Sequence, residues 1–109
     1  MYRGIKNLGQ NMKSFFMYIL KCRNGSYYVG HTDDIEKRMD QHSRGEGSSY
    51  VKERLPVELV YVEDFPTRDE AFNAERSIKN WSRKKKQALI DENFEKISQY
   101  AKKRFVKNK

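Results

Sequence analysis

Five polar side chains in this chain are of the types that hydrolyse phosphodiester bonds when they lie together: Tyr18, Tyr28, Arg38, His42 and Glu75. Such cleavage needs a base that takes a proton from water, a cation over the scissile phosphate and usually a metal ion on a carboxylate. Tyrosine is a poor base at neutral pH because its ordinary pKa is about 10, so a neighbouring histidine or bound metal must draw off its proton. The five residue types could supply these roles, but their spacing alone does not assign them.

The two tyrosines lie in segments that predict a β-hairpin. Residues 15–20 form an apolar run rich in strand-forming residues, and residues 26–30 form a second strand-like segment after Asn24-Gly25. Asn-Gly favours a type I′ turn between two strands. The first strand is apolar on both faces, which indicates a central or covered position in a sheet.

A predicted helix over residues 34–43 carries Arg38 and His42. Asp33, followed three residues later by Glu36, is typical of a capping box at the start of a helix. His42 falls on an apolar face, and Arg38, four residues earlier, lies on the neighbouring edge of that face. The apolar residues of this face are Ile35 and Met39.

Further along, residues 57–63 alternate apolar and polar side chains and predict a third strand. Thr67 and Glu70 form a second predicted capping box, before a helix that presents Glu75 at helical spacing with Ala71, Ala74 and Ile78. Trp81-Ser82 should end that helix, and further helices are predicted over residues 84–90 and 94–105. The order ββαβα plus C-terminal helices indicates an α+β fold or a sandwich-like α/β/α layout.

The excess positive charge lies near the C-terminal end of the chain. Residues 81–109 hold 10 of the 23 Lys and Arg residues but only 3 of the 15 Asp and Glu residues, and the net charge is +8. Such regions bind polyanions through counterion release, so we expect nucleic acid as the partner. No apolar Trp, Phe or Leu face accompanies the basic run, which argues against a membrane surface.

Composition also excludes several classes of protein. Cys22 is the only cysteine, so neither an internal disulfide nor a zinc cluster is expected. No apolar run approaches the roughly 20 residues of a membrane span, and residues 1–13 lack the apolar region of a signal peptide. We therefore expect a cytoplasmic protein with a flexible leader over residues 1–13, one domain over 14–93, and a helix with a basic tail over 94–109.

Several motifs, in order, resemble those of the GIY-YIG nuclease superfamily. Phe16-Met17-Tyr18 and Tyr28-Val29-Gly30 resemble its paired tyrosine motifs, although the family has Gly-Ile-Tyr at the first. The segment from Gly30 to His42 looks like its Arg-x-x-x-His helix, and residues 74–79 resemble its metal-binding glutamate segment. The match covers residues 15–91 and is most similar to the small, single-domain bacterial branch of UPF0213-like proteins. It implies a GIY-YIG-like three-stranded antiparallel sheet flanked by helices.

The resemblance also implies roles for the five residues. Tyr18 would activate water or relay its proton, Tyr28 would support the nucleophile, and His42 would take or orient the tyrosine proton. Arg38 would hold the scissile phosphate, and Glu75 would hold one divalent cation, Mg²⁺ or alternatively Mn²⁺. Basic residues outside this cluster would contact the nucleic-acid backbone: Arg54, Lys84, Lys85 and Lys86.

The implied function is a metal-dependent endonuclease that hydrolyses DNA. Because the chain ends soon after the motifs, we expect low sequence specificity, with branched or single-stranded DNA as targets and a steep salt dependence. Two alternatives stay open: a non-catalytic nucleic-acid-binding module, and an accessory of a DNA-repair complex, which a large exposed apolar patch would support. A monomer is assumed.

Each candidate residue also has an ordinary structural interpretation. The tyrosines could be core residues, and His42 could be a buried histidine satisfied by a hydrogen bond. Arg38 and Glu75 could be solvated helix charges. His31, next to the second tyrosine motif, could be either a site residue or a loop residue.

Overall fold

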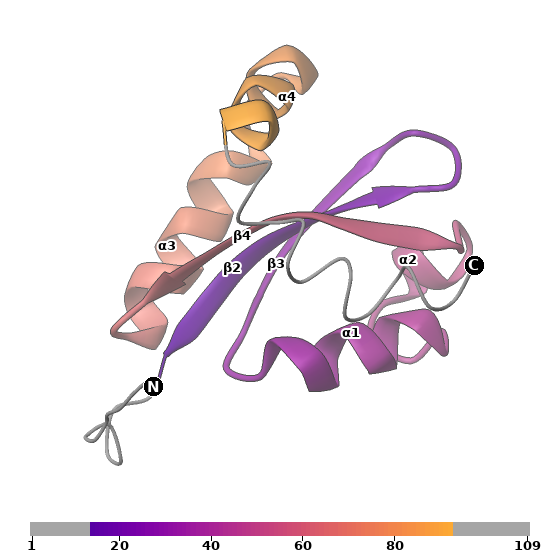
Figure 1. Cartoon of the computed structure of the whole chain (residues 1–109), viewed down its shortest axis with the longest axis horizontal. Helices are drawn as coiled ribbons and strands as arrows, with labels where there is room; N and C mark the ends of the chain where they lie inside the picture. The colour runs from indigo at the N-terminus through magenta and orange to yellow at the C-terminus, as the bar shows by residue number, and fades with distance from the viewer. Residues whose placement is uncertain (1–13, 93–109) are drawn as a thin grey trace.

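The computed structural model describes residues 14–92, which form a three-stranded sheet with helices packed against it (Figure 1). The strands are β2 (Phe15–Cys22), β3 (Tyr27–Thr32) and β4 (Val57–Phe65), antiparallel in the order β3-β2-β4. The helices are α1 (Ile35–Ser43), α2 (Ser49–Lys52), α3 (Arg68–Lys79) and α4 (Arg83–Glu92). The predicted α+β fold is confirmed. The predicted leader and the predicted helix and tail over 94–109 lie outside the described residues.

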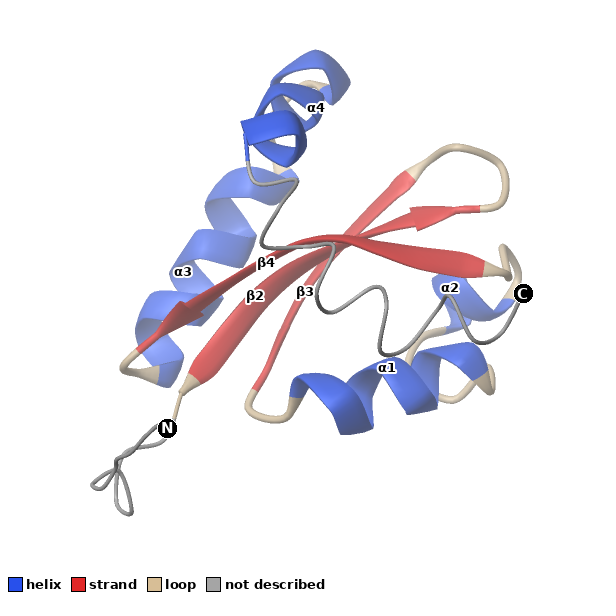
Figure 2. Cartoon of the chain, in the orientation of Figure 1, coloured by secondary structure: helices blue, strands red, loops and turns tan. Residues whose placement is uncertain are grey.

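The two faces of the sheet carry different helices. In the register of β2 with β3, Tyr18 lies opposite Gly30, and Met17 lies opposite His31. Alternate residues of a strand point to opposite faces. The Tyr18 side chain faces α1, where it meets His42, whereas His31 faces α3, where it meets Glu75. Figure 2 shows the same arrangement, with α3 on one side of the sheet and α1 with α2 on the other.

Strand β2 is the centre of the core, as its apolar sequence predicts. Met17, Tyr18, Ile19 and Leu20 are at most 1% exposed, because the strand has a neighbour on each edge and helices over both faces. The buried residues of the other elements pack around it in one cluster. Tyr18 is therefore held in place by the core itself.

The hairpin is confirmed, but its turn differs from the predicted type I′ turn. The Gly25 amide donates to the Cys22 carbonyl, so the turn is centred on Arg23 and Asn24, one residue earlier than predicted. Gly25 takes the left-handed conformation (φ 88°) that glycine accepts readily, and Asn24 Oδ1 accepts from the Ser26 amide. This is the arrangement of a three-residue hairpin loop.

The start of α1 corrects a second prediction. Asp34, not Asp33, is the N-cap, since its side chain accepts a hydrogen bond from the Lys37 amide (3.1 Å). Asp33 is thereby released from capping and pairs with Arg68 of α3 (3.4 Å). The predicted face of α1 is confirmed, with Ile35, Met39 and His42 buried.

Helix α3 begins where predicted, because the Thr67 side chain accepts from the Glu70 amide (3.2 Å). Its buried residues are Ala71, Glu75 and Ile78. The break before α4 at Trp81-Ser82 is confirmed. No helix within residues 14–92 is long and apolar enough to span a membrane.

Helix α2 was not predicted from the sequence. The Ser48 side chain caps it by accepting from the Val51 amide, and Val51 is completely buried. Helix α4 reaches the hairpin turn through Arg83, which donates to the Gly25 carbonyl (2.6 Å), and through a hydrogen bond between Tyr27 and Gln87. The hairpin end of the sheet is thus tied to the basic helix.

Candidate active site

The Tyr18 side chain packs across the neighbouring strand β3 at Gly30. A Cβ atom added to Gly30 would lie 2.6 Å from the Tyr18 hydroxyl and 2.7 Å from its Cζ. Any side chain at that position would therefore occupy the space of the tyrosine ring. The Tyr28-Val29-Gly30 motif on β3 therefore has two roles. It supplies the second tyrosine, and its glycine leaves the space that the Tyr18 ring fills.

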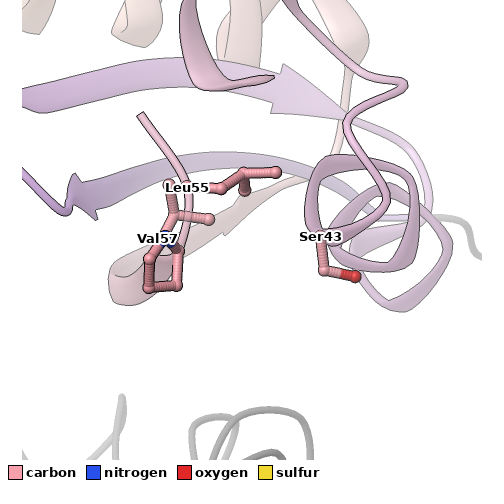
Figure 3. A pocket seen from close by; sticks show the side chains of 4 residues that line it. Ser43, Leu55 and Val57 are labelled. Carbon is pink, nitrogen blue, oxygen red and sulfur yellow. The ribbon is translucent and has the colours of Figure 1, made fainter. Parts of the chain in front are cut away.

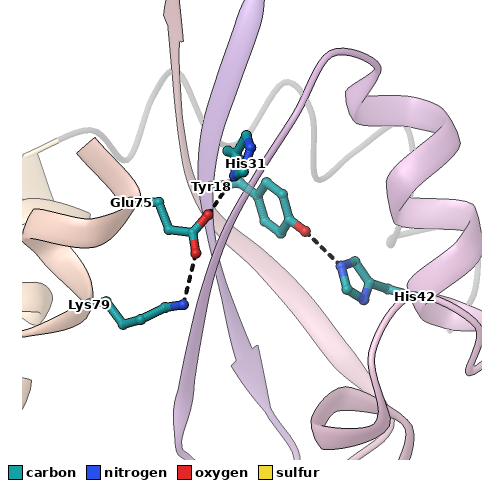
Figure 4. A network of polar contacts seen from close by, with 5 residues as sticks. All are labelled: Tyr18, His31, His42, Glu75 and Lys79. Carbon is teal, nitrogen blue, oxygen red and sulfur yellow. Dashed lines mark hydrogen bonds and ion pairs between the residues drawn. The ribbon is translucent and has the colours of Figure 1, made fainter. Parts of the chain in front are cut away.

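The Tyr18 hydroxyl lies 2.7 Å from Nε2 of His42 (Figure 4). His42 is completely buried, and Gly47 packs so closely against it that an added Cβ would lie 2.8 Å from Nδ1. Within the described residues, His42 Nδ1 has no hydrogen-bond partner. The tyrosine is therefore the polar contact that orients this imidazole.

Burial shifts both groups toward their neutral forms. Burial and, to a smaller extent, the nearby positive charge of Arg38 together lower the pKa of His42 to about 4, so the imidazole is neutral at pH 7. Burial raises the pKa of Tyr18 above its ordinary value, as does the nearby Tyr28, while Arg38 acts in the opposite direction. A neutral imidazole with Nδ1 protonated can accept the tyrosine proton at Nε2.

Tyr28 and Arg38 line the same site as Tyr18. The Tyr28 ring centre lies 6.4 Å from that of Tyr18 and 5.5 Å from that of His42, with its plane tilted steeply to the imidazole. Arg38 precedes His42 by one helical turn of α1, and its positive charge acts to lower the pKa of both Tyr18 and His42. The four groups form one connected cluster on the α1 side of the sheet.

Glu75 approaches the site from α3 and is 9% exposed. One carboxylate oxygen lies 2.6 Å from His31 Nδ1, and the other accepts from Lys79 Nζ at 2.8 Å (Figure 4). The hydrogen bond to Glu75 raises the pKa of Lys79, so the ammonium stays charged. Both oxygens of the buried carboxylate are thus satisfied by basic groups, as a buried charge requires.

A pocket of about 300 Å³ brings together the two sides of the edge strand β3. Four of the five predicted residues line it: Tyr18, Tyr28, Arg38 and Glu75. His42 does not line the pocket and lies behind Tyr18. The other lining residues are Gly30, His31, Thr32, Asp33 and Arg68.

Sequence reasoning missed Arg68, Asp33 and Lys79, and it left His31 undecided. Lys79 could have been found because it follows Glu75 by four residues on α3, the spacing of a helical ion pair. Arg68 precedes Glu75 by two helical turns and therefore projects from the same side of α3. His31 belongs to β3 and not to a loop, and only the packing of α3 against β3 brings it to Glu75.

The predicted backbone-contacting residues do not line the pocket. Arg54 lies over the Tyr50 ring, with its Cζ 3.7 Å from the ring centre, and donates to the Tyr50 carbonyl. On α4, Lys84 and Lys85 are exposed and Lys86 is half-buried, and Lys85 Nζ lies 4.3 Å from the centre of the Trp81 ring. These residues form basic surface outside the site.

The donor set suits a cation only together with substrate. Among the described residues, no three His, Cys, Asp or Glu side chains come together as a metal cage. Mg²⁺, however, is commonly held by one or two carboxylates plus water and substrate phosphates. Glu75 can provide that carboxylate if the ion replaces its contacts with His31 or Lys79.

A second, larger pocket lacks suitable chemistry. It has a volume of about 510 Å³ and is lined by Ser43, Leu55, Pro56 and Val57 (Figure 3). These residues offer one hydroxyl group and no charged side chain. Volume alone therefore does not identify the site.

Comparisons with known proteins agree with this geometry. Residues 14–88 match the family model of the GIY-YIG catalytic domain. A UPF0213 protein of Staphylococcus saprophyticus is 49% identical over 81 residues, covering 74% of this chain and 99% of that protein. One from Streptococcus pneumoniae is 42% identical over 78 residues, covering 72% and 79%.

Two solved structures are also similar. The solution NMR structure of a UPF0213 protein from Bacillus halodurans has a TM-score of 0.50 and 37% identity, covering 74% of this chain and 86% of that one. The solution NMR structure of the protein EF2693 from E. faecalis has a TM-score of 0.52 and 37% identity, covering 72% and 84%.

Proposed function

This chain belongs to the GIY-YIG catalytic domain family, and on that premise we propose that it is a metal-dependent endonuclease that hydrolyses DNA phosphodiester bonds. The observation that supports the proposal best is the pocket in which Tyr18, Arg38 and Glu75 meet from β2, α1 and α3. Family membership implies a nucleic-acid substrate. DNA as that substrate, low sequence specificity and a cytoplasmic location are parts of the proposal.

In this proposal, Arg38 binds a non-bridging oxygen of the scissile phosphate. Its guanidinium borders the pocket and offsets the negative charge that develops on the phosphate in the transition state. Arg68 lines the same pocket and offers a second guanidinium, although Asp33 partly neutralises it at 3.4 Å. A phosphate is therefore attracted to the Arg38 side of the pocket.

Tyr18 and His42 then form a path for the proton of the attacking water. The Tyr18 oxygen takes that proton while its own proton moves to His42 Nε2, 2.7 Å away. Because the pKa of Tyr18 is raised and that of His42 is about 4, the transfer is unfavourable in the free protein. A phosphate anion at Arg38 offsets the positive charge that lowers the pKa of His42, so the imidazole accepts a proton more readily with substrate bound.

Tyr28 and Glu75 complete the proposed machinery. Tyr28 lies beside Tyr18 and offers its hydroxyl to the nucleophile. Glu75 would hold one Mg²⁺ or Mn²⁺ ion, which when bound would supply positive charge to the oxygens of the scissile phosphate. To do so, Glu75 must exchange at least one of its contacts with His31 and Lys79.

Those two contacts also favour a second candidate, a nucleic-acid-binding module without catalysis. A carboxylate that is fully satisfied by His31 and Lys79 has less tendency to bind a cation. The accessory of a repair complex has weaker support, because the exposed large hydrophobic side chains of the described part are only Tyr50 and Phe72. A large apolar patch would need more.

A cleavage assay distinguishes the two candidates. Branched, single-stranded and duplex DNA are incubated with the wild type, Glu75→Gln and Arg38→Ala in Mg²⁺ or Mn²⁺. Loss of cleavage by at least about 100-fold in both variants supports the nuclease. Removal of one hydrogen-bond donor that stabilises a transition state typically has an effect of at least this size. Equal cleavage by all three proteins indicates a contaminating nuclease. DNA binding without cleavage in either metal supports the module.

A further inference from the structure

Two large hydrophobic side chains are exposed within residues 14–92, and both touch residues that line the candidate pocket. Tyr50 is 38% exposed, and its ring is stacked with that of Tyr28 at 6.1 Å between centres. Phe72 is 41% exposed, and its ring centre lies 5.3 Å from that of His31. An isolated exposed aromatic residue is common, but here both lie beside one polar pocket.

The position of Tyr50 is explained by its own contacts. Its ring packs against Tyr28 and against the Arg54 guanidinium, and its hydroxyl donates to Ser26 Oγ (2.9 Å). Phe72 has no polar atom that could anchor it in the same way. Arg76 Cζ lies 5.7 Å from the ring centre, near the outer limit of a cation–π contact. The Phe72 ring is therefore held less firmly by neighbouring groups than the Tyr50 ring is.

The neighbours of Phe72 on α3 are charged in a way that suits nucleic acid. Arg68 and Arg76 lie one helical turn before and after it on α3. The Arg76 guanidinium lies over the Phe72 ring, whereas that of Arg68 lies against Phe15 and Asp33. Arg68 and Glu75 of the same helix line the pocket. Proteins that bind single strands combine positive charge along the backbone with aromatic rings on which bases stack.

We propose that Phe72 is a stacking platform for an unpaired DNA base adjacent to the scissile phosphate. Arg76 and Arg68 would hold the flanking phosphates, and the ring would take the face of the base. A paired base in a duplex has both faces covered by its neighbours, so the platform selects single-stranded or splayed DNA. This inference rests on the proposed nuclease function and adds a substrate class and the residue that recognises it.

The test measures binding without cleavage. Fluorescence anisotropy in EDTA follows a labelled single-stranded oligonucleotide and a blunt duplex of the same sequence, using the full chain. Phe72→Leu should weaken binding of the single strand by about tenfold and change duplex binding by less than about twofold, because stacking on an aromatic ring contributes measurably for each base. Phe72→Tyr, which keeps the ring, should bind the single strand like the wild type.

A second readout reports stacking directly. An oligonucleotide with 2-aminopurine at successive positions should lose fluorescence at one position when bound by the wild type or Phe72→Tyr, and keep it when bound by Phe72→Leu. Equal effects of Phe72→Leu on single strand and duplex, or no effect on either, would overturn the platform. A dimer that Phe72→Leu dissociates without any change in DNA binding would instead identify this face as a contact between copies.

Cleavage of the same DNAs in Mg²⁺ separates this inference from the proposed function. If the wild type cuts DNA but Phe72→Leu shows no selective loss with single strands, the platform is wrong while the nuclease stands. If nothing is cut yet the selective binding loss and the 2-aminopurine signal are present, the platform stands and the hydrolase fails.

Discussion

The Tyr18 hydroxyl and His42 Nε2 lie 2.7 Å apart inside the protein, with side chains that are 1% and 0% exposed. A polar pair in such a place is stabilising only as a pair, because each partner satisfies the other in the absence of water. The same hydrogen bond that we propose as a proton path is therefore also part of the core.

Tyr18→Phe should lower the free energy of unfolding by about 1–3 kcal/mol, because it leaves the buried His42 without its hydrogen bond. The ring is kept, so packing changes little. Urea denaturation of the wild type and the variant measures the difference. Tyr61→Phe is a matched control, since Tyr61 is also buried in the sheet but bonds to the half-buried Glu63. A smaller loss for Tyr18→Phe than for Tyr61→Phe would contradict the argument.

Gly30→Ala should reduce cleavage by about 10–100-fold, since a displacement of about 1 Å in a catalytic group can have an effect of that size. The new methyl group would lie 2.6 Å from the Tyr18 hydroxyl and must displace the ring from its observed position. Cleavage kinetics measure the loss, and NMR signals of the Tyr18 ring report its displacement. Wild-type kinetics in Gly30→Ala would show that Tyr18 need not occupy its observed position.

The hairpin, α1 and α3 could be predicted from the sequence because local rules determine them. The apolar run of β2 and the Thr67 cap of α3 each depend on residues close in the chain. Local rules also explain the errors. Asp33 and Asp34 are both good N-caps, and Asn24-Gly25 fits either of two turn registers, so tertiary contacts made the choice.

The site was harder to predict because its contacts join distant segments. The ion pair of Glu75 with Lys79 follows from helical spacing, but its contact with His31 needs α3 packed against β3. Likewise, only the tertiary fold pairs Asp33 with Arg68. The motif resemblance identified four pocket residues and the histidine behind them. Their roles, and the extent of the domain over residues 14–93, stay predictions.

The pH dependence of stability should contain a contribution from His42. Its pKa is about 4 in the folded protein and 6.5 when unfolded, so the unfolded chain binds the extra proton more tightly. The stability that the neutral His42 contributes is therefore fully present above pH 6.5 and is lost as the pH falls toward 4. At about 1.36 kcal/mol for each unit of pKa shift, the whole contribution is roughly 3 kcal/mol.

Urea denaturation at a series of pH values tests this contribution. His42→Gln should have a shallower dependence between pH 6.5 and 4, although it is less stable at pH 7. The remaining dependence in the variant then comes from other groups. Parallel curves for the two proteins would mean that His42 titrates normally in the folded state.

The basic residues of α4 should govern the salt dependence of DNA binding if they contact the backbone. Replacing Lys84, Lys85 and Lys86 together by Gln should reduce the slope of log K against log salt by about 2–3 units, since each phosphate contact contributes about 0.7–0.9. Anisotropy titrations at several salt concentrations measure the slope. Lys37→Gln with Lys52→Gln, two exposed lysines on α1 and α2, controls for general loss of charge. An unchanged slope in the α4 variant would remove this helix from the interface.

Lys79→Gln should strengthen binding of a divalent cation, because Lys79 occupies one Glu75 oxygen at 2.8 Å and opposes a second positive charge. The Lys79 side chain is 56% exposed, so the competing ion pair is worth at most about 1 kcal/mol and the gain should be about two- to fivefold. Mn²⁺ titrations followed by electron paramagnetic resonance measure the affinity without DNA. Lys52→Gln, which removes an exposed lysine of α2, should bind Mn²⁺ like the wild type. Weaker binding in Lys79→Gln would show that this lysine holds Glu75 in the position needed for the ion, and the competition argument would be wrong.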